Sequence, residues 1–222
     1  LQLQDPVEKF IPEWKDLKVF QSGDRECIKT NNPERKMLIK DLMTHTSGLT
    51  YPFTDNTIVN QLYGEELWFN PKNYKMDSKE IVDKLSGLPL LFSPGEFWSY
   101  SISTDILGII IERISDNSLS EFLNVNIFIP LGMKDSGFSV PHSKKIRLTS
   151  LYSKTENGYQ VVEKGGNSTY LKDPSFYSGG GGGVSTIDDY MKFCSFLLSN
   201  GTFEGKKFLS ENSMKLLLSN QL

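Results

Sequence analysis

Tyr100 and Ser101 stand in the stretch EFWSYSIS, in a turn that leads directly into a very apolar helix. A tyrosine hydroxyl held at a rigid helix start can donate or accept a proton in acyl transfer. Its ordinary pKa of about 10 makes it a poor base unless a cation lies nearby. A turn tyrosine more commonly packs its ring and leaves its hydroxyl hydrated. Tyr100 is therefore a candidate catalytic residue only in the company of other motifs.

His45 and Ser47, in HTSG, also suggest nucleophilic chemistry. Residues two apart on a helix do not face each other, and no third group that would orient the histidine is evident. A histidine in the last turn of a helix interacts favourably with the helix dipole. We therefore interpret His45 as a structural residue.

Five consecutive glycines occupy positions 179–183. A phosphate-binding P-loop would need Gly-Lys-Ser/Thr at the following helix, whereas this run ends in Gly183-Val184-Ser185. A dinucleotide fingerprint would need a preceding strand that is not evident. Glycine also lets one backbone segment pass close to another or to a ligand, which is the interpretation we favour.

Metal and cofactor chemistry have little support in the sequence. His45 and His142 are the only histidines, and neither has a partner at metal-ligand spacing. We expect no metal and no cofactor.

The elements that must position these residues follow from apolar spacing and capping residues. Helices are predicted over 37–49, 77–87, 104–115 and 118–128, with another beginning after Ser185 or Thr186. The first is expected to end at Gly48, a typical helix-terminating glycine. The 104–115 helix carries isoleucines around nearly its whole circumference, so we expect it to be buried on most sides.

The remaining segments are β-prone or irregular. Strands are expected in 147–172, with a hairpin at Asn157-Gly158, and a small hairpin or loop in 201–210. The aromatic-rich stretch 50–76 is either a lid over a substrate or a satellite cluster under a long loop. The pattern predicts a mixed α and β protein in which much of any sheet is missing.

Composition narrows the function classes. The 24 basic and 27 acidic residues give a net charge of -3 without an evident basic patch, which argues against nucleic acid. The longest aliphatic run, ILGIII at 106–111, is far too short to span a membrane. Cys27 and Cys194 alone do not define a disulfide framework.

Four segments in order resemble the serine β-lactamase and penicillin-binding-protein-like superfamily, most closely its class C β-lactamase-like esterases. They are LMTHTSGL at 42–49, SPGEFWSYSISTDILGIIIERIS at 93–115, PLGMKDSGF at 130–138 and SGGGGGVSTIDDYMKFCSFLLSNG at 178–201. The resemblance implies an α+β fold of the β-lactamase/transpeptidase type, with residues 1–222 as the central part of one domain. Residues 37–145 would form a mostly helical subdomain. Residues 146–222 would return to an α/β subdomain with an incomplete antiparallel sheet.

The resemblance also implies a serine hydrolase that forms an acyl-enzyme, with Tyr100 as its acid/base. Ser101, Ile102, Gly180 and Gly181 would contact the substrate. β-Lactamases usually have asparagine where Ile102 stands, and isoleucine offers no amide to a substrate. This departure favours a small-ester carboxylesterase over an efficient β-lactamase.

Two of the family's motifs are missing. No lysine has a serine three residues before it, so Ser-x-x-Lys is absent. Lys164-Gly165-Gly166 resembles the late Lys-Thr-Gly strand but precedes the glycine run instead of following it. We therefore expect a fragment that lacks its nucleophile and is inactive alone.

The expected partner is a small-molecule ester or lactam, with no nucleic acid, no metal and no transmembrane segment. The resemblance points towards the periplasm or cell envelope. The alternatives are a β-lactamase or D-Ala-D-Ala carboxypeptidase, and a non-catalytic scaffold or binding module.

Overall fold

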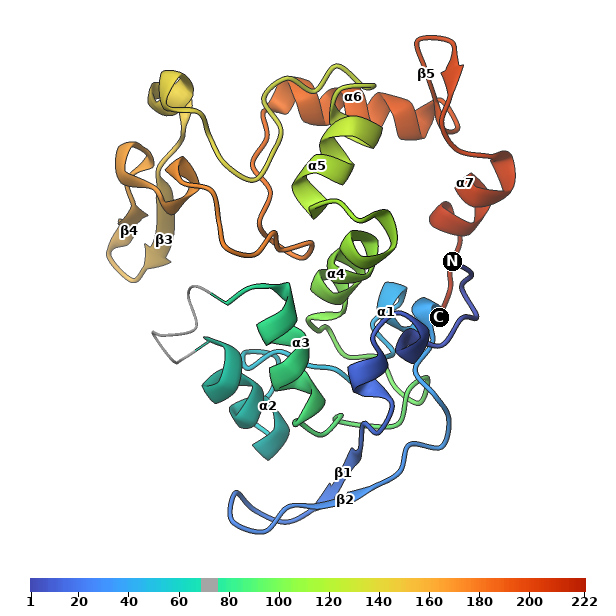
Figure 1. The fold of residues 1–222 in the computed structure, drawn as a ribbon. Helices are drawn as coiled ribbons and strands as arrows, with labels where there is room; N and C mark the ends of the chain where they lie inside the picture. Colours follow the sequence, from blue (N-terminus) through green and yellow to red (C-terminus); the bar gives the residue numbers. More distant parts are fainter. Residues whose placement is uncertain (69–75) are drawn as a thin grey trace. The chain divides into compact units, whose positions relative to one another are not determined.

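The computed structural model describes the backbone of residues 1–68 and 76–222 (Figure 1). Phe69 and Tyr74, two aromatics of the 50–76 stretch, lie outside these residues, as does the side chain of Trp68. The chain divides into two compact units. Unit 1 comprises residues 1–119, 175–181 and 221–222, and unit 2 comprises residues 120–174 and 182–220. The expected subdomain boundary between residues 145 and 146 stays a prediction.

In its described residues, unit 1 has more helix than strand and one small antiparallel sheet. Its elements are 3₁₀ turns at Val7–Lys9 and Pro12–Trp14, β1 Val19–Ser22, β2 Lys29–Asn31, α1 Ile39–Met43, α2 Ile58–Tyr63 with a π-helical continuation Gly64–Trp68, α3 Ser78–Ser86 and α4 Ser103–Ser115. β1 pairs with β2 across a bulge between Phe20 and Ser22. α1 packs against α4, so the segment after α1 lies near the start of α4.

Capping and burial explain the two longest helices of unit 1. Asp77 accepts a hydrogen bond from Glu80 N, and the Glu80 carboxylate accepts one from Asp77 N, which makes the capping box that starts α3. Ile106, Ile109 and Ile110 anchor α4 in the core. The expectation that α4 is buried on most sides is confirmed, although Ile114 is 50% exposed near its last turn.

The first predicted helix is much shorter than 37–49. α1 ends at Met43, and His45 adopts a positive φ of 56°. Thr46 N then donates to Asp41 O over 2.9 Å, the bond that closes a helix in a Schellman motif. His45 therefore holds the left-handed position that we had expected of Gly48. Gly48 has its own positive φ of 84° three residues later.

Unit 2 contains short helices and two hairpins. Its elements are α5 Leu119–Leu123 (beginning one residue before the unit), a π-helical turn Asn124–Phe128, 3₁₀ turns at His142–Arg147, Gly165–Asn167 and Thr169–Leu171, β3 Leu151–Thr155, β4 Gly158–Glu163, α6 Ile187–Leu198, β5 Thr202–Phe203, β6 Lys206–Lys207 and α7 Glu211–Leu218. β3 pairs antiparallel with β4 through a two-residue loop, and β5 pairs with β6. The hairpin predicted at Asn157-Gly158 is confirmed and 201–210 contains a hairpin, whereas 164–172 forms turns instead of strand.

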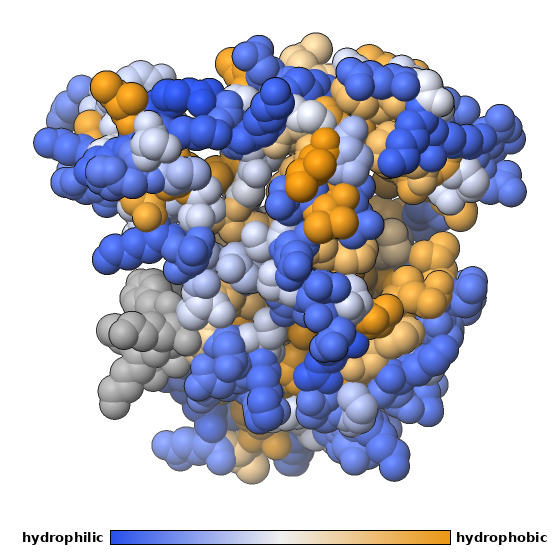
Figure 2. Space-filling model, turned by 45° about the horizontal axis from the view of Figure 1, so that its top comes forward, coloured by the Kyte–Doolittle hydropathy of each residue, from blue (hydrophilic) through white to orange (hydrophobic). Residues whose placement is uncertain are grey.

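The core of unit 2 is small. Phe196 of α6 packs with Leu131 and Met133. Thr186, one of the two capping residues that the sequence allowed, caps α6 by accepting a hydrogen bond from Asp189 N over 3.3 Å. Apolar side chains also lie among polar ones on the surface shown in Figure 2.

Candidate active site

Tyr100 lies in the turn that leads into α4, with its side chain 44% exposed. The residues on both sides of it are fixed. Ser99 N donates to His45 O over 2.9 Å, and Ile102 is the N-cap residue of α4. The Tyr100 phenol is thus presented to solvent from a backbone held at two points.

Aromatic rings surround Tyr100 within unit 1. The ring centroids of His45 and Tyr51 lie 5.0 Å and 5.3 Å from that of Tyr100. Phe53 stacks on Tyr51 at 4.8 Å, and Trp98 meets the His45 ring edge-on at 6.3 Å. Two aromatics of the 50–76 stretch, Tyr51 and Phe53, therefore gather beside Tyr100.

A chain of buried hydroxyl groups lies directly behind Tyr100. Ser101 Oγ is 3.2 Å from His45 Nδ1 and 2.8 Å from Ser103 Oγ. Ser103 Oγ is in turn 2.8 Å from Ser47 Oγ. All three serines are fully buried. Sequence reasoning tested His45 against Ser47 only and missed this arrangement, because His45 and Ser101 are 56 positions apart.

Asp105, one turn into α4, organises a second buried group of hydrogen bonds. Its carboxylate accepts from Tyr51 OH over 2.9 Å, from Ser178 Oγ over 2.5 Å and from Gly180 N over 3.2 Å. Burial, together with the negative charge of Asp105, raises the pKa of Tyr51 well above its usual range. Tyr51 consequently stays protonated and serves as a donor.

The glycine run makes the predicted close approach at its first two positions. A Cβ added to Gly179 would lie 2.6 Å from Thr104 O, and one on Gly180 would lie 2.7 Å from an Asp105 carboxylate oxygen. A Cβ on Gly181 would meet nothing within 4 Å. Glycine is therefore needed where the run crosses the first turn of α4.

The other predicted substrate contacts have different surroundings. Ser101 is buried in the hydroxyl chain, and Ile102 belongs to the apolar core of unit 1. Gly180 N donates to Asp105, and Gly181 N donates to Ser178 Oγ over 3.1 Å. The substrate-binding roles of Ser101, Ile102, Gly180 and Gly181 stay predictions.

A part-buried ion pair lies beside His45. Arg35 donates to both oxygens of Asp41, over 2.7 Å and 2.9 Å. The same carboxylate accepts from Thr46 Oγ1 over 3.3 Å. Partial burial lowers the pKa of His45, which favours the neutral imidazole.

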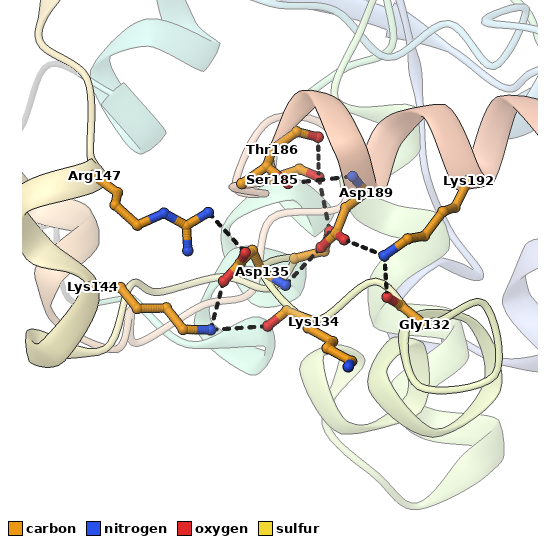
Figure 3. A network of polar contacts seen from close by, with 10 residues as sticks. Gly132, Lys134, Asp135, Lys144, Arg147, Ser185, Thr186, Asp189 and Lys192 are labelled. Atoms are coloured by element: carbon orange, nitrogen blue, oxygen red, sulfur yellow. Dashed lines mark hydrogen bonds and ion pairs between the residues drawn. The ribbon is translucent and has the colours of Figure 1, made fainter.

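A second polar cluster lies in unit 2 (Figure 3). Asp189 accepts from Asp135 N over 2.6 Å and from Lys192 Nζ over 3.0 Å. The Arg147 and Lys144 side chains hold the pKa of Asp135 well below its usual range. Because each carboxylate is matched by cations and backbone donors, this cluster fixes the start of α6 and offers no reactive group.

Within the described residues, no group of three or more histidine, cysteine, aspartate or glutamate side chains could hold a metal ion. None of the helices in residues 1–68 and 76–222 combines the length and apolarity needed to cross a membrane.

The amino-acid sequence of this chain is similar to those of several known proteins. Protein Rv1367c of Mycobacterium tuberculosis is 32% identical over 229 residues, covering 100% of this chain and 54% of that protein. Lovastatin esterase of Penicillium rubens is 32% identical over 205 residues, covering 90% of this chain and 49% of the esterase. The chain thus spans about half the length of the curated relatives it matches. Further relatives are named as an esterase and as acyltransferases.

The fold has a close solved counterpart. A mutant simvastatin synthase from Aspergillus terreus superposes with a TM-score of 0.77 at 22% identity, covering 100% of this chain and 51% of the synthase. At that identity the likeness establishes the fold, an α+β arrangement of the β-lactamase/transpeptidase type. The family model described as Beta-lactamase matches residues 1–221. The chain therefore belongs to the Beta-lactamase family, whose members include esterases and acyltransferases.

Proposed function

We propose that the protein containing this chain is a serine hydrolase that cleaves small carboxylic esters through an acyl-enzyme, with Tyr100 as the acid/base. The observation that carries the proposal is the presentation of the Tyr100 phenol. It is partly exposed, while Ser101 beside it is fully buried and hydrogen-bonded. A proton-transfer group needs this combination of solvent access and fixed orientation.

In this mechanism Tyr100 acts as a phenolate held by the charge of the expected lysine, accepts the proton of the attacking serine and passes it to the leaving alcohol. During deacylation the phenolate accepts a proton from the attacking water and returns it to the serine oxygen as the acyl bond breaks. A serine is a weak nucleophile without such a partner. Because no serine of this sequence has a lysine three residues after it, we expect the nucleophile and its lysine to come from another part of the protein. Residues 1–222 alone should therefore not hydrolyse esters at an enzymatic rate.

The ester preference rests on residue 102 and on the relatives. Ile102 packs in the apolar core and offers no amide to a lactam substrate. A relative 32% identical to the chain is named as an esterase. Several relatives are named as acyltransferases, so an alcohol could replace water as the acceptor of the acyl group.

The test is Tyr100→Phe in the full-length protein, assayed with p-nitrophenyl esters. We expect kcat/KM to fall by about 10²- to 10⁴-fold, the usual contribution of a positioned acid/base. Tyr159→Phe, an exposed tyrosine of β4, is the matched control and should leave the rate unchanged. Turnover of Tyr100→Phe within about threefold of the parent protein would contradict the assignment, since a positioned acid/base contributes far more.

Two further measurements separate the alternatives. Transfer of the acyl group to an added alcohol would place the protein with the acyltransferases. Covalent labelling by a fluorescent penicillin, together with lactam turnover faster than ester turnover, would indicate a β-lactamase or peptidase. A full-length protein with neither activity would be a scaffold.

A further inference from the structure

His45 contacts the Tyr100 turn in three ways. Its ring packs on the Tyr100 ring with centroids 5.0 Å apart and planes tilted by 48°. Its Nδ1 lies 3.2 Å from Ser101 Oγ, at the very next residue. Its carbonyl accepts from Ser99 N over 2.9 Å. One residue therefore holds the ring of Tyr100, the backbone before it and the side chain after it.

The hydroxyl chain that begins at Ser101 continues into the buried interior of unit 1. Ser103 and Ser47 are fully buried, and Leu49 N donates to Ser47 Oγ over 3.2 Å. Buried hydroxyls must satisfy their hydrogen bonds, so each member restricts the geometry of the next. His45 is the half-buried end of this chain, where it meets Tyr100.

The backbone explains why few side chains could replace His45. With φ at 56° this position suits glycine, asparagine, aspartate or histidine, and disfavours bulky or β-branched residues. Among these, histidine brings both a ring that can pack on a phenol and a nitrogen that can bond to a hydroxyl.

We infer that His45 is a positioning residue for Tyr100, fixing the orientation of the phenol through ring packing and through the Ser101 hydroxyl. This inference rests on the proposed function, because it assigns His45 an effect on catalysis that passes through Tyr100. It assigns His45 no contact with the substrate.

The experiment is a double-mutant cycle in the full-length protein. His45→Gly removes the side chain and keeps the positive φ at no strain, and His45→Asn keeps a polar group there. We expect His45→Gly to lower kcat by about 10- to 100-fold with little change in KM, as a misplacement near 1 Å does. His45→Asn should recover the part of that loss that passes through the Ser101 hydroxyl, and leave the part that depends on ring packing. In the Tyr100→Phe background, His45→Gly should cost less than about twofold, because its effect passes through the missing hydroxyl.

Ser101→Ala removes the hydrogen bond without touching the left-handed position, and should behave like His45→Gly in both backgrounds. It keeps the test intact if His45→Gly lowers the melting temperature too far for assay. If His45→Gly and Ser101→Ala lower the rate by the same factor in the Tyr100→Phe background as in the parent protein, the inference is wrong and the proposed function still stands. A His45→Gly rate within threefold of the parent would lead to the same conclusion. Undiminished turnover of Tyr100→Phe alone would instead reject the proposed function.

Discussion

At the scale of single residues, His45 combines an uncommon backbone conformation with a half-buried titratable ring. Its φ of 56° terminates α1, and the Thr46 hydroxyl beside it is tied to Asp41, which Arg35 neutralises. Protonating the imidazole would place a charge where burial disfavours it. The stability of the protein should therefore depend on the protonation state of His45.

The sign of that dependence follows from the direction of the shift. Burial lowers the pKa of His45 in the folded protein, so below pH of about 6.5 the unfolded chain binds more protons at this residue. The stabilising contribution is complete above the unfolded pKa and is lost as the pH falls towards the folded pKa. We expect the parent protein to lose more free energy of unfolding between pH 7 and pH 5 than His45→Asn does, measured by urea denaturation.

His142 provides the comparison for this measurement. It is the only other histidine, and its side chain is exposed at the start of a 3₁₀ turn. His142→Asn should retain the full pH dependence of the parent protein. Identical curves for His45→Asn and the parent would show that burial of His45 carries no such cost.

At the scale of elements, the glycine run and α4 are separate segments that touch through backbone. Gly179→Ala would push a Cβ to 2.6 Å from Thr104 O, which is backbone and cannot rotate away. We expect Gly179→Ala to lower the free energy of unfolding by about 1–3 kcal/mol, as overpacking does. Gly181→Ala meets no atom within 4 Å and should change it by less than about 0.5 kcal/mol. Equal urea midpoints for the two variants would rule out the close approach.

Elements whose signals are local could be predicted from the sequence. Capping residues at Asp77 or Ser78 and at Ser185 or Thr186 indicated the starts of α3 and α6, and Asn157-Gly158 indicated the β3–β4 hairpin. The end of α1 could not be predicted, because glycine at position 48 is the stronger terminator by propensity. The bond from the Thr46 hydroxyl to Asp41 and the long-range bond from Ser99 N to the His45 carbonyl instead favour the turn at His45.

The candidate site was predictable only in part. Tyr100 stood out because a turn preceded a very apolar helix, and the surrounding motifs gave it a role. The residues around it did not stand out in the sequence. His45 and Tyr51, which contact Tyr100, and Ser178, which binds Asp105, come from segments distant in sequence. One sequence carries no local signal for a hydrogen bond between residues 56 positions apart.

At the scale of the whole molecule, exposed apolar side chains are prominent. Ile146 is 95% exposed, and α6 exposes Leu198 and Ile187 by 87% and 83% while Phe196 packs inward. α6 is thus apolar on both its inner and its outer sides. Apolar surface of this kind normally lies against other protein.

We therefore expect a polypeptide of residues 1–222 to bind a hydrophobic dye and to associate with rising concentration. The combined change Ile187→Lys and Leu198→Lys should reduce both effects, because both side chains are exposed and contribute little to the core. Dye fluorescence and light scattering measure them. A monodisperse polypeptide that melts cooperatively without binding the dye would contradict this expectation.

The β3–β4 hairpin differs from the rest of the molecule in having nearly every residue of both strands exposed. Its loop at Glu156 and Asn157 follows a strand that supports no core, and exposed loop tips tolerate insertions well. A fluorophore or an affinity peptide placed between these two residues would leave the core of unit 1 and the Tyr100 turn intact. The hairpin thus offers a position at which the protein could be attached to a surface or labelled for single-molecule measurements.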